Sequence, residues 1–263
     1  VMNAEEITFD VLMQYNLEPE LFSFGILDAF EEYIKQSGIS NYPVHIKLDT
    51  GMRRLGFEEK DIEELCSRLK YSSVFKIQSV FSHLAASDSE SHDDFTKMQA
   101  RAFLESCKKI EEITGYSFLR HLANTSAIHR HKELQLDMVR LGIGLYGVDA
   151  HEEIQQQLKN VTTLKSTVSQ IKKIKKGESV GYNRKGVATR NSVIATVRIG
   201  YADGYPRLMS NGTGKMWING NRVPVIGNVC MDMTMLDITG IEVNEGDEVI
   251  VFGEELRVNE VAG

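Results

Sequence analysis

DMVRLGIGLYG, residues 137 to 147, divides the chain, because the pattern of the sequence differs on its two sides. Strand-like and helix-like segments alternate before it, and strand-like runs follow it. Apolar residues at every second position around Arg140 predict the end of a buried strand. Gly142 and Gly144 leave the backbone uncovered, so N–H groups near Gly142 and Ile143 can approach an anion such as phosphate. An ordinary turn between two domains explains the same residues equally well.

Composition and charge favour a globular protein with a small ligand. The chain has 263 residues, of which 42% are hydrophobic and 25% are charged, a balance typical of globular proteins. Its net charge of −7 argues against nucleic acid or an anionic membrane as a partner. The 3 cysteines are widely spaced, so we expect neither a disulfide framework nor a metal site, which fits a reducing cytoplasm. We find no apolar run of the about 18 residues that a membrane span needs.

The first part of the chain predicts an α/β fold. Strands separated by helices of this length imply parallel βαβ units, in which ligands bind outside the carboxyl ends of the strands. The expected elements are a helix over 19–38 beginning at Pro19 and Glu20, a strand over 43–49, a helix over 58–71, a strand over 74–85, a helix over 89–115 and a strand over 118–127. Polar residues gather at or just after the strand ends, namely Lys47, Arg54, His83, Asn124, Thr125 and Arg140.

From about residue 159 the pattern changes to strand-like runs, most of them closed by Gly, Asn or Asp. These runs indicate a separate all-β domain. We therefore expect an α/β domain over residues 1–150 and a β domain over residues 151–263. The basic run KKIKKG, residues 172 to 177, is interpreted as a solvated strand face before a turn.

Each candidate site residue has a simpler explanation when it is taken alone. His83 at a strand end fits a hydrogen-bonded core histidine, and Asn124 with Thr125 fits a cap on the helix that follows. Tyr182 and Tyr201 fit surface tyrosines of the β domain. Single residues therefore do not decide the function.

The combination of motifs resembles the alanine racemases. These are pyridoxal-phosphate enzymes of fold type III, with an N-terminal (β/α) TIM-type barrel and a C-terminal β domain. The motifs that carry the resemblance are PVHIKLDTGMRRLGF (43–57), VFSHLAASD (80–88), HLANTSA (121–127), MVRLGIGLYG (138–147), GESVGYN (177–183), IGYADGYPR (199–207) and VPVIGNVCMDMTMLDIT (223–239). Their order and spacing make the resemblance far more specific than any one motif.

The resemblance implies roles for three catalytic residues. Arg140 matches the arginine that faces the pyridine nitrogen of the cofactor, where a permanent cation leaves that nitrogen unprotonated and makes the ring a weaker electron sink. His83 matches a histidine hydrogen-bonded between this arginine and a catalytic tyrosine. Tyr182 matches that tyrosine, the base that takes the α-proton from L-alanine.

The resemblance also implies cofactor and substrate contacts. The Thr125 hydroxyl and the backbone N–H groups of Gly142 and Ile143 would hold the phosphate of pyridoxal 5′-phosphate, with Asn124 beside them. The residues implied at the substrate are Arg54 near the alanine carboxylate, Met231 and Asp232 in the loop that closes over it, and Tyr201 at the entrance. Lys47 matches a lysine that some members carry as a carbamate beside the arginine; its state here is left open.

The implied protein is a cytoplasmic isomerase that supplies D-alanine for cell-wall peptidoglycan. In the family, the tyrosine of one subunit faces the cofactor of the other, so we expect a head-to-tail homodimer. Two alternatives remain. One is a racemase of another small amino acid such as serine, and the other is a non-catalytic ligand-binding or assembly module derived from the same fold.

The chain departs from the family in one respect. The cofactor lysine of the family, in a motif that reads like KANAYGHG, has no match in this sequence. The expectation is therefore an internal fragment, a partial barrel with a truncated β domain, which lacks the N-terminal lysine segment and the extreme C-terminus. Alone, it is expected to be inactive and to bind the cofactor weakly at most. We also expect its open sheet edges to pair with another copy or to be locally disordered.

Overall fold

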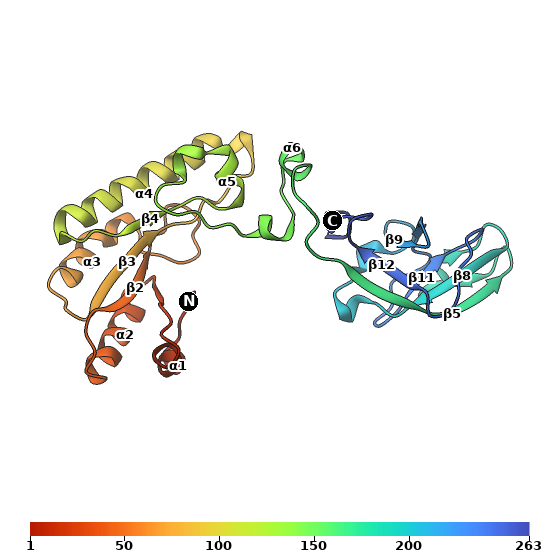
Figure 1. Cartoon of the computed structure of the whole chain (residues 1–263), viewed down its shortest axis with the longest axis horizontal. Coiled ribbons are helices and arrows are strands. Elements are labelled where there is room, and N and C mark those ends of the chain that lie inside the picture. The colour runs from red at the N-terminus through yellow and green to blue at the C-terminus, as the bar shows by residue number, and fades with distance from the viewer. Residues whose placement is uncertain (263) are drawn as a thin grey trace. The chain divides into compact units, whose positions relative to one another are not determined.

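The computed structural model describes residues 1–262, which form two compact units. The first unit comprises Val1–Gly144 and Asp149–Glu152. The second comprises Leu145–Val148 and the chain from Glu153 onward. Figure 1 shows a sheet with long helices in the first unit and a sheet with short connecting segments in the second.

The first unit is built on a parallel sheet of four strands in chain order. Three helices, α2, α3 and α4, connect consecutive strands as βαβ crossovers. They lie along the sheet in Figure 1. This is the α/β architecture of part of a TIM-type barrel, as predicted. The elements are α1 (Phe9–Gln14), β1 (Glu20–Leu21), α2 (Phe24–Gln36), β2 (Tyr42–Lys47), α3 (Ile62–Leu69), β3 (Phe75–Phe81), α4 (Asp93–Thr114), β4 (Leu119–His121) and α5 (Thr125–Arg130).

Local chemistry explains where the helices begin and end. The Ser23 hydroxyl accepts a hydrogen bond from the N–H of Ile26 and caps α2. Gly115, with φ of 72°, ends α4 in the left-handed conformation that favours glycine. The predicted helix start at Pro19 and Glu20 is wrong, because Glu20 lies in β1 and pairs with β2. Two residues are too few for the alternating pattern of a strand to show in the sequence.

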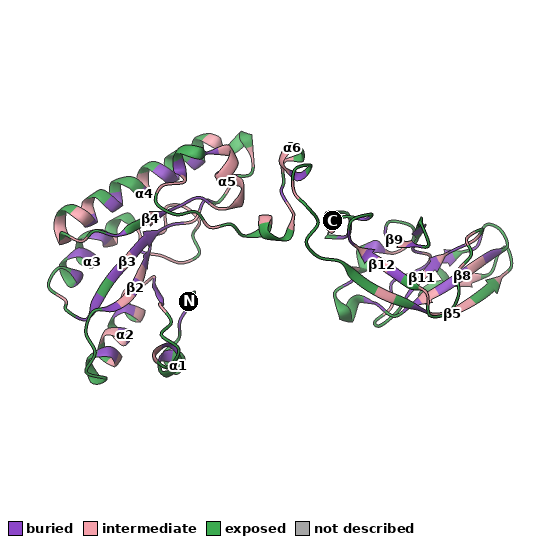
Figure 2. Cartoon of the chain, viewed as in Figure 1, coloured by how far each residue is buried: buried purple, intermediate pink, exposed green. Residues whose placement is uncertain are grey.

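The two faces of the parallel sheet differ in polarity. Val44 and Ile46 of β2 are buried in the hydrophobic core that the sheet shares with the helices. His45 and Lys47 alternate with them and therefore point to the opposite face. Figure 2 shows the buried strands and the exposed outer sides of the helices. We expect the functional site on the polar face, because a hydrophobic core does not require charged and imidazole side chains such as Lys47 and His45.

The predicted buried strand end around Arg140 is wrong. Leu141 and Ile143 are 46% and 58% exposed, and residues 143–146 form a single turn of 3₁₀ helix. This segment pairs with β4 through a single isolated parallel bridge between Met138 and His121, which is too short to form a strand. An alternating apolar run forms a buried strand only where other strands pair with it and other elements pack against its apolar face.

The second unit is an antiparallel β fold with a six-stranded sheet in the order β10-β9-β12-β5-β8-β11. This agrees with the predicted all-β character, although two single-turn helices, α6 (Glu152–Gln155) and α7 (Asn259–Ala262), also occur after residue 150. Lys172 and Lys173 in the basic run are exposed, as expected. The strands are β5 (Leu164–Ile174), β6 (Ser179–Val180), β7 (Gly186–Val187), β8 (Ser192–Val197), β9 (Lys215–Ile218), β10 (Asn221–Pro224), β11 (Thr234–Asp237) and β12 (Glu248–Phe252). Among the helices of residues 1–262, we find none with the length and apolarity to cross a bilayer.

Candidate active site

The polar face of the parallel sheet carries a row of three side chains at the carboxyl ends of the strands. Strand register places Lys47 beside Phe81 and Phe81 beside His121. The Phe81 and His121 rings stack with centroids 4.8 Å apart, and the Lys47 ammonium lies 5.5 Å from the Phe81 centroid. Parallel register therefore gathers residues from β2, β3 and β4 at the edge where ligands of α/β folds bind.

Arg140 lies over this row and is held by hydrogen bonds to the strand ends. Its Nη1 contacts His121 Nδ1 at 2.5 Å and donates to the His121 carbonyl at 3.0 Å. Its Nη2 donates to the Ser82 carbonyl at 2.6 Å. Its guanidinium carbon is 5.2 Å from the Phe81 centroid. A planar guanidinium with several short hydrogen bonds is fixed in position before any ligand binds.

His83 shares the positive environment of this edge. Burial, followed by the charges of Arg140, Arg54 and Lys47 in that order, lowers the pKa of His83 to about 4. The ring is therefore neutral at neutral pH and can accept a proton or hydrogen bond. The hydrogen bonds of Arg140 go to His121 and to strand carbonyls, whereas the resemblance implied His83 as its partner.

Sequence reasoning missed His121, which stands at the end of a chain of hydrogen bonds. Glu18 Oε2 contacts His45 Nε2 at 2.8 Å, and His45 Nδ1 contacts the Ser79 hydroxyl at 2.6 Å. Ser79 in turn contacts His121 Nε2 at 2.8 Å, and His121 Nδ1 contacts Arg140. The signal available in the sequence was the position of His121 at a strand end, where parallel sheets carry their ligands.

Protonation of His121 is expected to destabilise the fold at low pH. Burial and the Arg140 charge lower the pKa of His121 to about 3, against about 6.5 for an unfolded histidine. Stability from the neutral ring is complete above about pH 6.5 and is lost as the pH falls toward about 3. Between about pH 4.5 and 6, the unfolding free energy of the unmodified chain should fall with acidification more steeply than that of His121→Gln. The difference between the two slopes should be about 1.4 kcal/mol per pH unit. Urea unfolding across this range measures the slope.

The matched control is His92→Gln, which removes an exposed histidine of the same unit. Its slope should equal that of the unmodified chain. If His121→Gln also keeps that slope, His121 is not the group that takes up the proton on unfolding.

Glu20 is a second residue that sequence reasoning did not assign to the site. Its carboxylate oxygens lie 3.4 and 3.5 Å from Lys47 Nζ, and both side chains are 3% exposed. The two residues come from neighbouring strands β1 and β2. A buried lysine without a counter-ion is costly, so this pairing explains how Lys47 is accommodated as an ammonium.

Thr125 and two glycine N–H groups converge at the start of α5. The N–H of Gly142 and that of Gly144 point to the Thr125 hydroxyl oxygen at 3.0 and 3.4 Å. A side chain at position 144 would lie 2.8 Å from Leu141 and 2.9 Å from Thr125, so glycine is needed there for the close approach. Asn124 Oδ1 accepts the N–H of Ala127 and caps α5. This arrangement puts a hydroxyl and backbone donors at one point, as a phosphate requires.

The second unit holds the other candidate residues around one pocket. A pocket of about 750 Å³ is lined by Tyr182, Met231, Asp232 and neighbouring strand residues such as Thr196 and Met235. The Tyr182 side chain is 70% exposed, so its phenol is free to contact a ligand. Three of the residues that the resemblance implied thus line a single hollow of the β unit.

Tyr201 is tied to the same loop by backbone pairing. The N–H of Tyr201 donates to the Cys230 carbonyl at 3.0 Å, and the N–H of Ala202 donates to the Met231 carbonyl at 2.9 Å. A Cβ at Gly200 would lie 2.2 Å from the Met231 carbonyl oxygen, so any larger residue would separate the two segments. The segment after β8 therefore positions the Met231 loop.

Comparison with known proteins decides the family. The family model described as "Alanine racemase, N-terminal domain" matches residues 2–150, and "Alanine racemase, C-terminal domain" matches residues 161–263. The chain belongs to the alanine racemase family. It is 39% identical over 251 residues to alanine racemase 1 of Clostridium acetobutylicum, covering 93% of this chain and 64% of that protein. It is 36% identical over 257 residues to the alanine racemase of Clostridium tetani, covering 95% of this chain and 65% of that protein.

Solved structures of the family agree with the fold described here. The alanine racemase of Clostridium difficile 630 superposes with a TM-score of 0.88 at 31% identity, covering 99% of this chain and 70% of that one. The alanine racemase of Bartonella henselae, solved with covalently bound pyridoxal phosphate, gives a TM-score of 0.85 at 30% identity, covering 98% and 70%. This chain thus spans about two thirds of the length of its family relatives.

Proposed function

We propose that the protein containing this chain is a pyridoxal-phosphate-dependent alanine racemase, an isomerase that interconverts L-alanine and D-alanine. The observation that carries the proposal is the Arg140 guanidinium, fixed at the carboxyl end of the parallel sheet in a chain of the alanine racemase family. The activity is proposed for the whole protein, because the chain covers 64% of the first relative compared. D-Alanine made in the cytoplasm for cell-wall peptidoglycan is the proposed product.

The residues at the sheet edge fit pyridoxal 5′-phosphate. The Thr125 hydroxyl and the N–H of Gly142 suit its phosphate, and Gly144 N–H supplies a second donor at the point where the resemblance implied Ile143. Arg140 suits the ring nitrogen, because its guanidinium is a hydrogen-bond donor held at the strand ends by His121 and the Ser82 carbonyl. When bound, the cofactor supplies an electron sink for the bond between the α-carbon and its hydrogen.

Arg140 keeps its own proton in this role. Burial lowers the pKa of Arg140 to about 10, which still leaves the guanidinium cationic at neutral pH. It therefore donates to a ring nitrogen without transferring a proton to it. His83, neutral and surrounded by cations, is proposed to orient the tyrosine base.

Tyr182 is proposed as the base that takes the α-proton of L-alanine, with Met231, Asp232 and Tyr201 enclosing the substrate and Arg54 holding its carboxylate. We propose a head-to-tail homodimer in which Tyr182 serves the sheet of the other subunit. The exposed phenol of Tyr182 supports a role toward a partner.

The test is D-alanine formation from L-alanine by the purified whole protein, of which this chain is a part, with pyridoxal phosphate. Activity on alanine supports the proposal, and activity on L-serine alone supports a serine racemase instead. A correctly folded protein that racemises neither is a non-catalytic module. Mixing inactive Arg140→Ala and Tyr182→Phe subunits should restore about a quarter of the activity, because one site in each mixed dimer combines two intact halves. No recovery would show that Tyr182 acts within its own subunit.

A further inference from the structure

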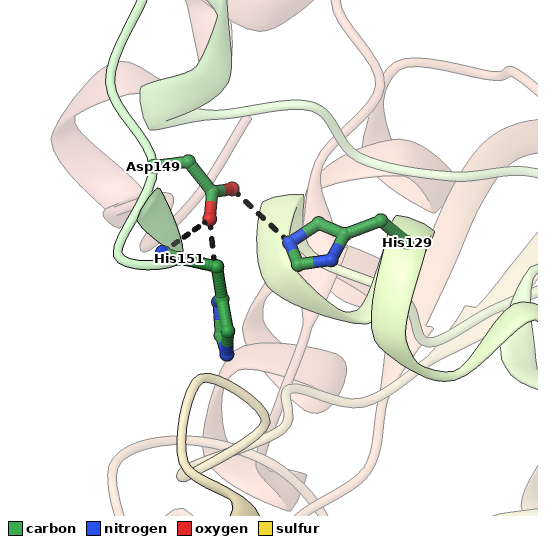
Figure 3. A group of neighbouring side chains, drawn as sticks. All are labelled: His129, Asp149 and His151. Atoms are coloured by element: carbon green, nitrogen blue, oxygen red, sulfur yellow. Dashed lines mark hydrogen bonds and ion pairs between the residues drawn. The ribbon is translucent and has the colours of Figure 1, made fainter. Parts of the chain in front are cut away.

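His129, Asp149 and His151 form a compact cluster that the proposed reaction does not use (Figure 3). His129 lies in the last turn of α5, and the other two residues lie in Asp149–Glu152, the later segment of the first unit. Asp149 Oδ2 is 3.2 Å from His129 Nε2, and Asp149 Oδ1 is 3.3 Å from His151 Nδ1. One nitrogen or oxygen atom from each residue lies within 4.8 Å of the others.

The carboxylate of this cluster is buried, whereas both rings reach solvent. The Asp149 side chain is 1% exposed, and the side chains of His129 and His151 are 20% and 26% exposed. Figure 3 shows a ring nitrogen of His129 facing the carboxylate, and His151 Nδ1 lies 3.3 Å from the same carboxylate. A buried anion faced by two nitrogen ligands, with partly open rings for access, has the features of a cation site.

A backbone hydrogen bond also orients the carboxylate, in addition to the contacts of the two rings. The N–H of His151 donates to Asp149 Oδ1 at 2.9 Å. The rings of His129 and His151 are 5.0 Å apart between centroids, at an angle of 74°. The two imidazoles therefore approach the carboxylate from different directions and do not stack on each other. Such an outer hydrogen bond commonly fixes the orientation of a metal-binding carboxylate.

We propose that His129, Asp149 and His151 bind one zinc ion or a similar borderline divalent cation. Zinc is bound at about 2.0 to 2.2 Å by imidazole nitrogen and carboxylate oxygen, so two ligands of a tetrahedral site are about 3.3 Å apart. Each histidine already has this separation from one carboxylate oxygen, His129 Nε2 from Oδ2 at 3.2 Å and His151 Nδ1 from Oδ1 at 3.3 Å. One ligand atom from each residue lies within 4.8 Å of the others, so binding draws the two partly exposed rings closer to a shared ion. Water occupies the fourth position.

The bound ion would hold the Asp149–Glu152 segment against α5. The first residue of this short helix is Thr125, and its cap is Asn124, so the metal site and the phosphate cradle are at opposite ends of one helix. The role proposed for the ion is structural, because its ligands join the Asp149–Glu152 segment to α5. Hydrogen bonds alone within the cluster are the competing interpretation, and they predict no zinc binding.

The experiment measures zinc content and does not depend on racemase activity. The protein is stripped with a chelator, incubated with zinc in the presence of a chromophoric competitor and desalted, and zinc per chain is determined by elemental analysis. We expect the unmodified protein and the control His92→Gln to retain one more zinc per chain than His129→Gln and His151→Gln. Zinc should also raise the Tm of the first two proteins and not that of the two cluster variants.

Equal zinc content in the unmodified protein and in both cluster variants would overturn the proposal. So would a zinc-dependent rise in Tm that survives both substitutions. Circular dichroism confirms that each glutamine variant is folded, and cobalt substitution provides a second readout. Tetrahedral cobalt bands should be present in His92→Gln and absent from His129→Gln; bands of equal strength in both would also contradict the assignment.

Discussion

Tyr182→Phe is expected to lower kcat for alanine racemisation by about 10² to 10⁴, the usual contribution of a positioned general base. The phenol is 70% exposed and lines the pocket beside Met231, so losing its hydroxyl removes chemistry without creating a cavity in the core. The Tm should therefore remain unchanged. The measurement is the initial rate of D-alanine formation by the whole protein with pyridoxal phosphate.

Isotope exchange makes this experiment specific to the proposed role. If Tyr182 removes the α-proton of L-alanine, then Tyr182→Phe should stop exchange of that proton with deuterated water. Exchange from D-alanine should persist, because Tyr182 is proposed to act on the proton of L-alanine. Tyr71→Phe, which alters another highly exposed tyrosine, is the control and should keep both exchange rates. Racemisation by Tyr182→Phe within about threefold of the unmodified protein would exclude a general-base role, which is worth far more.

Glu20→Gln is expected to destabilise the first unit by about 3–5 kcal/mol, the usual cost of leaving one ion of a buried pair without its partner. The Lys47 ammonium is 3% exposed and its distance to the Glu20 carboxylate is 3.4 Å. After the substitution, Lys47 keeps its charge in an environment with little water. Urea unfolding of Glu20→Gln, of Lys47→Met and of the variant that combines the two substitutions gives the free energies of unfolding.

The double variant Glu20→Gln with Lys47→Met separates the charge effect from packing. It should recover most of the lost stability, because it removes both buried charges together. The same series tests carbamylation of Lys47, which would make that side chain an anion beside Glu20. In that case Glu20→Gln would stabilise the fold, and the intact mass of the protein would include the added carbon dioxide. We expect neither, since the geometry supports an ammonium paired with a carboxylate.

Much of the fold and part of the site were predictable from local patterns. The alternation of helices and strands predicted the parallel sheet, and Gly115 predicted the end of α4. The ordered motifs predicted the family, because each lies within a few consecutive residues. His83 was identified because it follows a strand end, where parallel sheets carry their ligands, and Arg140 because its motif resembles that of the family.

Long-range pairing accounts for what the sequence did not reveal. His121 contacts Arg140 from 19 residues away, and Glu20 contacts Lys47 from 27 residues away. Such contacts depend on strand register and on where each helix returns the chain. The alternating run around Arg140 predicted a buried strand, but exposure depends on whether another element packs against it.

The sequence by itself determined the alternation of strands and helices, the end of α4 at Gly115 and the family, because these depend on side chains a few positions apart. The tertiary structure decided which charges meet and which are removed from water. It brought Glu20 to Lys47, His121 to Arg140, and Asp149 to His129. The physical reason is that burial strengthens electrostatic interactions, and burial is created only when distant segments pack together.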